Sequence, residues 1–208
     1  MMSLIDLKKQ VLEYAQRGYA QGLMAGTSGN LSVRFEKDKL VITPSGINYL
    51  TMTERDVMVI DLDGNIIEGP HRPSTEWPMH AEIYKNRPDV DSVVHTHSPY
   101  ATAFSVINEP IPLVLIEMVL FLLREVPVAP VATQGTPDVG VGVVNALGTD
   151  GVACLMQNHG ALTVGKTLEE AYIRSEYLED SAKICHMARA IGTPTVMPEA
   201  IVREMQDR

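Results

Sequence analysis

Apolar residues recur along the chain with two different periods. Leu4, Leu7, Val11 and Tyr14 are spaced by three or four residues, which predicts a helix over 4–19. Short apolar runs predict strands over 31–34, 40–43, 57–62, 65–67, 92–96, 152–156 and 161–164. Helical patterns over 75–85, 99–106, 137–147 and 168–190 interleave with these strands. This interleaving predicts an α/β fold of three layers.

Local signals mark several element boundaries. Thr167 followed by Glu170 forms a capping box at the start of the longest predicted helix. Asp63 and Gly64 separate two strands, as in a two-residue hairpin turn. No internal repeat or low-complexity linker divides the chain, so we expect residues 1–208 to form a single domain.

Composition excludes several classes of protein. The chain is 45% apolar and 21% charged, which is ordinary for a globular domain, and its net charge of −9 disfavours nucleic-acid binding. The apolar run 111–123 contains Glu117 and is shorter than the roughly 20 residues of a membrane span, which predicts a core or interface segment. The N-terminus lacks the apolar core of a signal peptide, and Cys154 and Cys185 form no metal-binding pattern. We therefore expect a cytoplasmic protein with reduced, buried thiols.

The most informative motif is His95-Thr96-His97, at the end of an apolar strand. Because side chains alternate between the two faces of a strand, His95 and His97 point the same way. Two imidazoles on one face have the geometry that neighbouring ligands of one metal ion require. From this motif alone, the alternative is two ordinary hydrogen-bonded histidines at a strand end.

A third histidine, His159, lies between two buried strands in the segment QNHG at 157–160. A single histidine in a tight turn is usually a surface residue, but this one completes a set of three imidazoles. Three nitrogen ligands with an open position are typical of a catalytic zinc site, because a substrate oxygen can then enter the coordination sphere.

The segment RPSTE at 72–76 precedes a predicted helix. Ser74 and Thr75 are most simply helix N-caps, although hydroxyls and free amides at a helix N-terminus also form anion sites. Glu76 is expected in the first helical turn, where it could be a fourth metal ligand, a proton shuttle or both. His80 shares a helical face with Glu76, and we expect it to be a core residue or a partner of the ligands.

Two polar, glycine-containing loops flank predicted strands, TSGN at 27–30 and TPSG at 43–46. Their small side chains and backbone amides could hold a phosphate, although each loop taken alone is an ordinary turn. Neither loop matches a P-loop, and no GxGxxG follows a strand, so nucleotide binding by those routes is not predicted.

Taken in order, these motifs resemble the class II aldolase/adducin family. The matching segments are TSGNLSVR, TPSG, RPSTEWPMHAEIY, VVHTHSPYATAFS and QNHGALTVGKTLEEAY. The resemblance runs from about residue 5 to 190, and it is nearest to the L-fuculose-1-phosphate and bacterial deoxypentulose-1-phosphate aldolases. It implies a three-layer α/β/α fold around a mostly antiparallel sheet. It also implies a four-fold symmetric homotetramer with active sites at the subunit interfaces.

The resemblance further implies roles for particular residues. One divalent metal would be held by Glu76, His95, His97 and His159, with Zn²⁺ favoured and Mn²⁺ or Co²⁺ as alternatives. Glu76 would also be the catalytic carboxylate. The substrate phosphate would be bound by a larger set, namely Thr27, Ser28, Gly29, Asn30, Ser45, Gly46, Ser74 and Thr75.

One position departs from the family pattern. After the Ile-Pro motif these aldolases carry a tyrosine, contributed by a neighbouring subunit, where this chain has Ile116. That tyrosine would protonate the aldehyde oxygen, so the departure leaves this role to Glu117 or to a C-terminal group. Use of a different, more apolar aldehyde is the other explanation.

The resemblance therefore predicts a lyase that cleaves a ketose 1-phosphate to dihydroxyacetone phosphate and an aldehyde. The candidate substrates are L-fuculose 1-phosphate and the 5-deoxypentulose or methylthioribulose 1-phosphates. Its expected partners are this sugar phosphate and other copies of the chain, without nucleic acid or membrane. The alternatives are a ribulose-5-phosphate 4-epimerase, a methylthioribulose-1-phosphate dehydratase, or a non-catalytic adducin-like interaction module.

Overall fold

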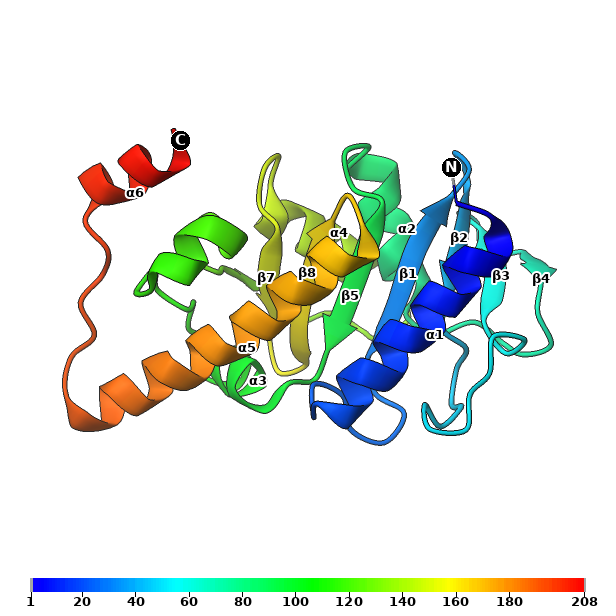
Figure 1. Cartoon of the computed structure of the whole chain (residues 1–208), viewed down its shortest axis with the longest axis horizontal. Coiled ribbons are helices and arrows are strands. Elements are labelled where there is room, and N and C mark those ends of the chain that lie inside the picture. The colour runs from blue at the N-terminus through cyan, green and yellow to red at the C-terminus, as the bar shows by residue number, and fades with distance from the viewer. Residues whose placement is uncertain (1, 208) are drawn as a thin grey trace.

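An eight-stranded sheet runs through the middle of the molecule in the computed structural model, which describes residues 2–207 (Figure 1). The strand order is β4-β3-β2-β1-β5-β8-β7-β6, and every neighbouring pair is antiparallel except β6 and β7. The strands are Asn30–Phe35 (β1), Lys39–Ile42 (β2), Met58–Asp61 (β3), Ile66–Glu68 (β4), Ser92–Thr96 (β5), Val128–Ala129 (β6), Ala153–Met156 (β7) and Gly160–Gly165 (β8).

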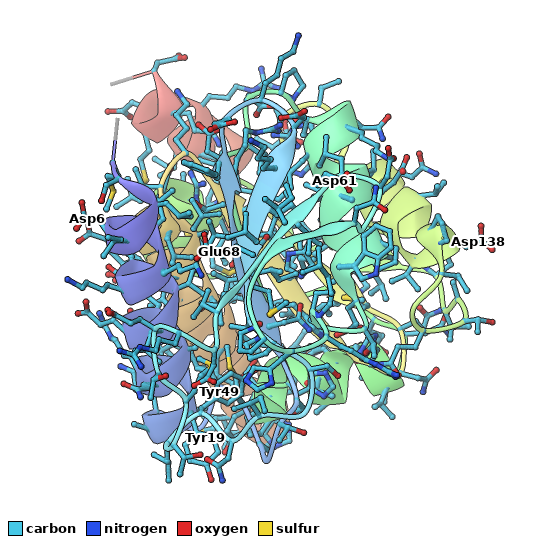
Figure 2. All side chains as sticks on the ribbon, turned by 90° about the vertical axis from the view of Figure 1, so that its right-hand side faces the viewer. Asp6, Tyr19, Tyr49, Asp61, Glu68 and Asp138 are labelled. Atoms are coloured by element: carbon cyan, nitrogen blue, oxygen red, sulfur yellow. The ribbon has the colours of Figure 1, made fainter. Side chains whose placement is uncertain are left out.

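Helices cover both faces of this sheet, which confirms the expected three-layer α/β arrangement. One face carries α1 (Leu4–Ala20), α3 (Pro99–Val106) and α5 (Leu168–Ile191), and the other carries α2 (Trp77–Asn86) and α4 (Pro137–Leu147). Figure 2 shows the layers edge-on, with Asp6 of α1 on one side and Asp138 of α4 on the other.

Alternation along the central strands decides which side chains face which helices. On β1, Leu31 packs into the core beneath α1, so Asn30 and Ser32 point to the face that α2 covers. On β5, Val93 belongs to the core beneath α2 and α4, and His95 shares its side of the strand. The strands therefore direct polar side chains toward the start of α2.

Capping residues set the predicted helix starts. The Ser3 hydroxyl accepts a hydrogen bond of 3.2 Å from the N–H of Asp6 at the start of α1. The Thr167 hydroxyl accepts one of 3.1 Å from the N–H of Glu170 at the start of α5. Each bond satisfies an N–H that has no partner within its helix, which explains why these boundaries could be predicted.

The apolar run 111–123 is divided between core and surface. Ile111 forms an isolated bridge with Val126, and Met118–Leu122 form the π-helix η1. Part of η1 is buried, but Leu120 is 54% exposed. Within residues 2–207 no helix is both long and apolar enough to cross a membrane.

Three elements were not predicted from the sequence, namely η1, β6 and α6 (Glu199–Gln206). Strand β6 has two residues, too few to show a period. Helix α6 has no buried residue, and it rests on η1, where the side chain of Gln206 donates a hydrogen bond of 2.6 Å to the carbonyl of Leu123. In Figure 1 an extended segment leads back from the end of α5 to α6.

Candidate active site

Four side chains meet where the end of β5, the β7–β8 turn and the start of α2 converge. They are Glu76, His95, His97 and His159, and one ligand atom of each lies within 4.8 Å of the others. Glu76 Oε2 is 3.2 Å from His95 Nε2, and Glu76 Oε1 is 3.1 Å from His159 Nε2. The Nε2 atoms of His95 and His97 are 3.1 Å apart. The structure thus brings together all four residues of the predicted metal site.

Sheet pairing explains why residues far apart in sequence meet here. Strands β5 and β8 pair antiparallel with Thr96 opposite Ala161, so the β7–β8 turn carries His159 over the end of β5. Gly160 is required at this point, because a Cβ atom there would collide with the carbonyl oxygen of Thr96.

The ring of His95 is oriented by the neighbouring strand. Its Nδ1 lies 2.9 Å from the carbonyl oxygen of Ala161, which can only accept a hydrogen bond. In the neutral ring the proton is therefore on Nδ1, and Nε2 directs its lone pair into the cluster. A backbone carbonyl often fixes a metal-binding histidine in this way.

Two buried polar atoms of the cluster, Glu76 Oε1 and His159 Nε2, lie 3.1 Å apart, and neither makes a hydrogen bond of good geometry with a described atom. The side chain of Glu76 is only 4% exposed, and that of His95 is fully buried. Burying a carboxylate among imidazole rings with incomplete hydrogen bonding is costly, so the arrangement calls for a cation between them. One carboxylate oxygen and three imidazole nitrogens are ligands that a divalent transition metal prefers, and the residues therefore fit such an ion.

The electrostatics of the cluster couple Glu76 to the histidines. Burial alone would raise the pKa of Glu76, but the charges and hydrogen bonds of His95 and His159 hold it well below its ordinary range. Burial alone would lower the pKa of His95, but the Glu76 carboxylate raises it above its usual value. Burial and the charges of His95 and His159 lower the pKa of His97 to about 4. A metal ion entering the cluster would compete with protons for these ligand atoms.

Glu76 reaches the cluster from the N-terminus of α2. The helix begins at Trp77, later than predicted, so Glu76 is its N-cap and not a first-turn residue. Pro78 explains the shift, because proline suits the first turn, where its missing N–H has no partner to lose. Glu76 Oε2 also accepts a hydrogen bond of 2.7 Å from Nδ2 of Asn30.

The three predicted phosphate-binding segments are joined through their backbones. The N–H of Ser45 donates to the carbonyl of Arg72 at 2.9 Å, and that of Ser74 donates to the carbonyl of Thr43 at 3.0 Å. The N–H of Leu31, at the end of the first segment, donates to the hydroxyl of Thr43 at 3.3 Å. The segments therefore lie side by side at the start of α2.

The predicted phosphate-binding residues differ in exposure. Those that solvent reaches are Thr27, Ser28, Ser45, Gly46 and Thr75, and those that are buried are Gly29, Asn30 and Ser74. The hydroxyl of Ser28 donates to the carbonyl of Ala25 at 2.6 Å, so it stabilises its own turn.

Glu117 lies apart from the cluster. It is an exposed residue at the N-cap of η1, next to Ile116, which is 53% exposed. Among the described contacts, no hydrogen bond or ion pair links Glu117 to the four clustered side chains.

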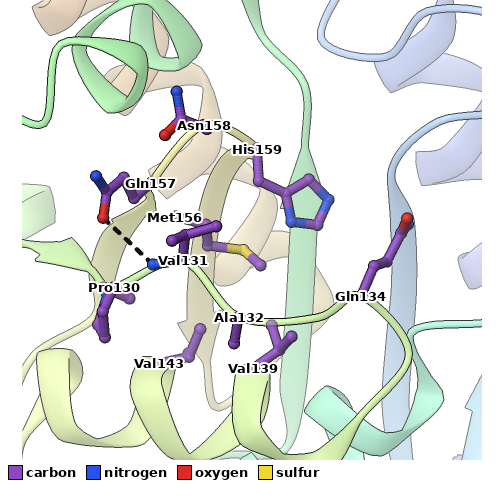
Figure 3. A pocket seen from close by; sticks show the side chains of 11 residues that line it. Pro130, Val131, Ala132, Gln134, Val139, Val143, Met156, Gln157, Asn158 and His159 are labelled. Carbon is purple, nitrogen blue, oxygen red and sulfur yellow. Dashed lines mark hydrogen bonds between the residues drawn. The ribbon is translucent and has the colours of Figure 1, made fainter.

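A cavity of about 200 Å³ opens beside His159 (Figure 3). Its walls come from the segment 129–134, from α4 and from the end of β7, and apolar side chains such as Val139 and Met156 line it. Figure 3 shows Gln134 on the same side of the cavity as the His159 ring. Polar side chains, among them Gln134 and Gln157, share the lining, so the cavity beside the cluster is partly apolar and partly polar.

A line of buried polar side chains behind Glu76 was only partly predicted. His80 Nε2 is 2.5 Å from Asn30 Oδ1, and His80 Nδ1 is 2.6 Å from Ser32 Oγ. Ser32 Oγ is in turn 2.8 Å from the hydroxyl of Tyr84. The signal in the sequence was the four-residue spacing of Glu76, His80 and Tyr84, which places them on one helix face.

Comparisons with known proteins agree with this geometry. The family described as Class II Aldolase and Adducin N-terminal domain matches residues 9–186. An L-fuculose phosphate aldolase of Methanococcus vannielii is 38% identical over 184 residues, which are 88% of this chain and 97% of that protein. A 5-deoxy-D-ribulose 1-phosphate aldolase of Bacillus thuringiensis is 33% identical over 199 residues, 95% of this chain and 92% of that protein.

A solved structure of an L-fuculose 1-phosphate aldolase is 36% identical and superposes with a TM-score of 0.92. The match covers 100% of this chain and 97% of that one, which confirms the predicted class II aldolase fold. The family and the cluster together support a divalent metal ion as cofactor. The chain belongs to the class II aldolase and adducin family.

Proposed function

We propose that this protein is a metal-dependent aldolase that cleaves a ketose 1-phosphate to dihydroxyacetone phosphate and an aldehyde. The observation that carries the proposal is the buried cluster of Glu76 and three histidines, whose ligand atoms all lie within 4.8 Å of one another. The names of the relatives, which are aldolases of L-fuculose phosphate and 5-deoxy-D-ribulose 1-phosphate, support the same reaction class.

The residues proposed to hold the metal are Glu76, His95, His97 and His159. Zn²⁺ suits three imidazole nitrogens and a carboxylate oxygen best, and Mn²⁺ or Co²⁺ would suit the same ligands. When bound, the ion supplies Lewis-acid polarisation of the ketose carbonyl. His95 presents its Nε2 lone pair for this purpose because Ala161 holds its other nitrogen.

The cleavage requires two proton transfers. When the bond between C3 and C4 breaks, C3 must gain a proton, and we assign its donation to Glu76, which would take that proton back in the synthetic direction. The hydroxyl on C4 must lose a proton as the aldehyde forms, and we assign this step to Glu117 of a neighbouring subunit. In the cleavage direction Glu76 thus acts as the acid at C3 and Glu117 as the base at the C4 hydroxyl.

The substrate phosphate is proposed to lie on the three joined segments at the start of α2. Backbone N–H groups and hydroxyls at a helix N-terminus favour an anion. Asn30 donates one N–H of its amide to Glu76, and its second N–H is left for the phosphate. The full set is Thr27, Ser28, Gly29, Asn30, Ser45, Gly46, Ser74 and Thr75.

We further propose that the protein assembles as a four-fold symmetric homotetramer, with active sites between subunits. Ile116 and Leu120 are 53% and 54% exposed, and α6 has no buried residue. Contiguous exposed apolar side chains are typical of an interaction surface. An interface here would also bring Glu117 next to another copy.

For the aldehyde part of the substrate, the apolar part of the cavity beside His159, formed by Val139, Val143 and Met156, favours a short, weakly polar group. We therefore expect 5-deoxypentulose and methylthioribulose 1-phosphates to be cleaved at least as well as L-fuculose 1-phosphate. A hydroxyl that enters an apolar wall loses hydrogen bonds to water without replacing them.

The test is release of dihydroxyacetone phosphate from a panel of these ketose 1-phosphates. The protein is stripped of metal with a chelator and reloaded with Zn²⁺, Mn²⁺ or Co²⁺, and the stripped sample serves as control. We expect cleavage only after reloading, and full activity in a demonstrably metal-free sample contradicts the mechanism. An epimerised sugar without release would instead indicate a 4-epimerase, and a diketone would indicate a dehydratase.

A further inference from the structure

A column of five buried polar side chains runs between β1 and α2, away from the proposed metal site. In order it contains Glu76, Asn30, His80, Ser32 and Tyr84, so that helix and strand residues alternate. A helix rises about 6 Å over four residues, and a strand advances about 6.6 Å over two. This near match of spacings lets each strand side chain lie between two helix side chains.

The direction of the hydrogen bonds in the column follows from chemistry alone. The Glu76 carboxylate can only accept, so the Asn30 atom 2.7 Å from it is the amide nitrogen. The other end of that amide is then the oxygen, which also can only accept. His80 Nε2, at 2.5 Å from this oxygen, must therefore carry a proton.

The remaining bonds complete the same pattern. His80 is fully buried, and burial lowers its pKa to about 3, so the ring is neutral and Nδ1 has a free lone pair. The hydroxyl of Ser32, 2.6 Å away, therefore donates to Nδ1. The hydroxyl of Tyr84 donates to the backbone carbonyl oxygen of Ser32 at 3.0 Å and lies 2.8 Å from Ser32 Oγ. The side-chain donors of Ser32, His80 and Asn30 thus point toward Glu76.

We propose that His80 is a positioning residue: held in the neutral tautomer with its proton on Nε2, it fixes the amide of Asn30 and, through it, the carboxylate of Glu76. The role of Glu76 rests on the proposed function. Without the donor on His80 the Asn30 amide is free to rotate by half a turn. Its oxygen would then face a Glu76 oxygen and repel it, and the second N–H would leave the phosphate segment.

This role differs from that of a histidine that merely fills the core, because it depends on one donor atom. Gln and Met have nearly the same shape, but only Gln can donate to the Asn30 oxygen from the place of His80 Nε2. His80→Gln and His80→Met are therefore matched variants. Thr163→Val serves as a control, since Thr163 is a fully buried hydroxyl of the same sheet that bonds to the carbonyl of Ala171.

The first measurement needs no substrate. Zn²⁺ affinity is determined by competition with a chromophoric chelator, and for His80→Met we expect about tenfold weaker binding, as is usual when a partner of a metal ligand is removed. For His80→Gln and Thr163→Val we expect a change of less than about threefold. Equal losses in His80→Gln and His80→Met would overturn the proposal.

The second measurement is made on the unaltered protein, and a variant serves only to assign the signal. Nitrogen NMR of histidine-labelled protein should show His80 neutral with its proton on Nε2, assigned by loss of the signal in His80→Gln. A proton on Nδ1 would contradict the proposal. Both measurements stand even if no ketose phosphate is cleaved, so they separate this inference from the proposed function.

The third measurement is a double-mutant cycle on turnover. If His80 acts through Asn30, adding His80→Met to Asn30→Ala should lower kcat by less than about twofold, although His80→Met alone lowers it by about tenfold. Independent, multiplicative losses would show that His80 does not act through Asn30 and would overturn the proposal.

Discussion

The four-residue cluster and the surface formed by Ile116, Leu120 and α6 differ in how much of their structure one chain completes. In the cluster, side chains from distant parts of one chain are buried together, and Glu76 is only 4% exposed. At the second surface, which we call the C-terminal surface, apolar side chains remain exposed and α6 buries none of its own. A cation alone would balance the buried polar groups of the cluster. The exposed apolar side chains of the C-terminal surface would be buried only by another protein surface.

This difference suggests a division of labour within the proposed reaction. Metal binding and the chemistry at C3 depend on one subunit, because β5, the β7–β8 turn and the start of α2 of a single chain position their residues. Proton transfer at C4 depends on assembly, because Glu117 lies on the C-terminal surface. The predictions below separate the two regions, beginning with the largest expected effect.

Replacing the carboxylate of the cluster should have the greatest effect. In Glu76→Gln we expect kcat to fall by about 10² to 10⁴, because the proton donor to C3 is lost. Metal and phosphate binding should persist, as measured by metal content and by binding of inorganic phosphate. Glu82→Gln on the same helix, outside the cluster, should retain wild-type turnover. Unchanged turnover in Glu76→Gln would exclude the assigned role.

On the other side of the comparison, Glu117→Gln should lower kcat by about 10², at the low end for a lost acid–base group. Metal affinity should not change, since Glu117 contacts none of the clustered residues within one chain. Rates are measured with every aldehyde or ketose phosphate that the protein accepts. If none of them is affected, Glu117 has only a structural role.

A charge on the C-terminal surface should act through assembly. We expect Leu120→Glu to reduce the molecular mass measured by light scattering, because a charge on this surface disfavours assembly. We also expect kcat to fall by about tenfold, because Glu117 of the neighbouring subunit would no longer be held in position for catalysis. The matched control is Ile5→Glu, an exposed position on α1 that is 62% accessible. A Leu120→Glu protein that keeps its mass would show that this surface is not the interface.

The smallest effect concerns the loop that leads to Ser74. Its His71 donates a hydrogen bond to Asp56, and this bond, with those from Thr53, lowers the pKa of Asp56 to about 2. A carboxyl whose pKa is lowered by folding stabilises the protein above its unfolded pKa and loses that contribution as pH falls. Asp56→Asn should therefore cost on the order of 1 kcal/mol at pH 7.

This cost should shrink as the pH falls from about 4 to 2, because the wild-type carboxyl is then protonated as well. Urea unfolding of both proteins across this range measures it. A difference in unfolding free energy that stays constant with pH would contradict the assignment to Asp56.

Prediction from sequence succeeded where the cause lies among neighbouring residues. The helix opened by Thr167 and the helix Pro137–Leu147 begin as predicted, since caps and first-turn prolines act within a few positions. It failed for η1 and α6. The conformation of η1 depends on how a uniformly apolar segment packs against the rest of the protein, because such a segment has no period of its own. Helix α6 has no buried side chain, so its sequence carries no pattern of buried positions.

The candidate site shows the same limit. Alternation along a strand was enough to place His95 and His97 together, but their approach to Glu76 depends on which helix covers that face. Helix α2 also begins two residues later than predicted, because Pro78 favours the first turn. Glu76 is therefore the N-cap of the helix.

The amino-acid sequence thus established the layers of the fold, the family and the types of ligand, because these follow from short-range periods and ordered motifs. The tertiary structure decided which of these residues meet. His159 reaches His95 only through the pairing of β5 with β8, and His80 reaches Asn30 only because α2 lies along β1. The direction of the hydrogen bonds toward Glu76 is likewise tertiary, since each donor is fixed by a partner distant in sequence.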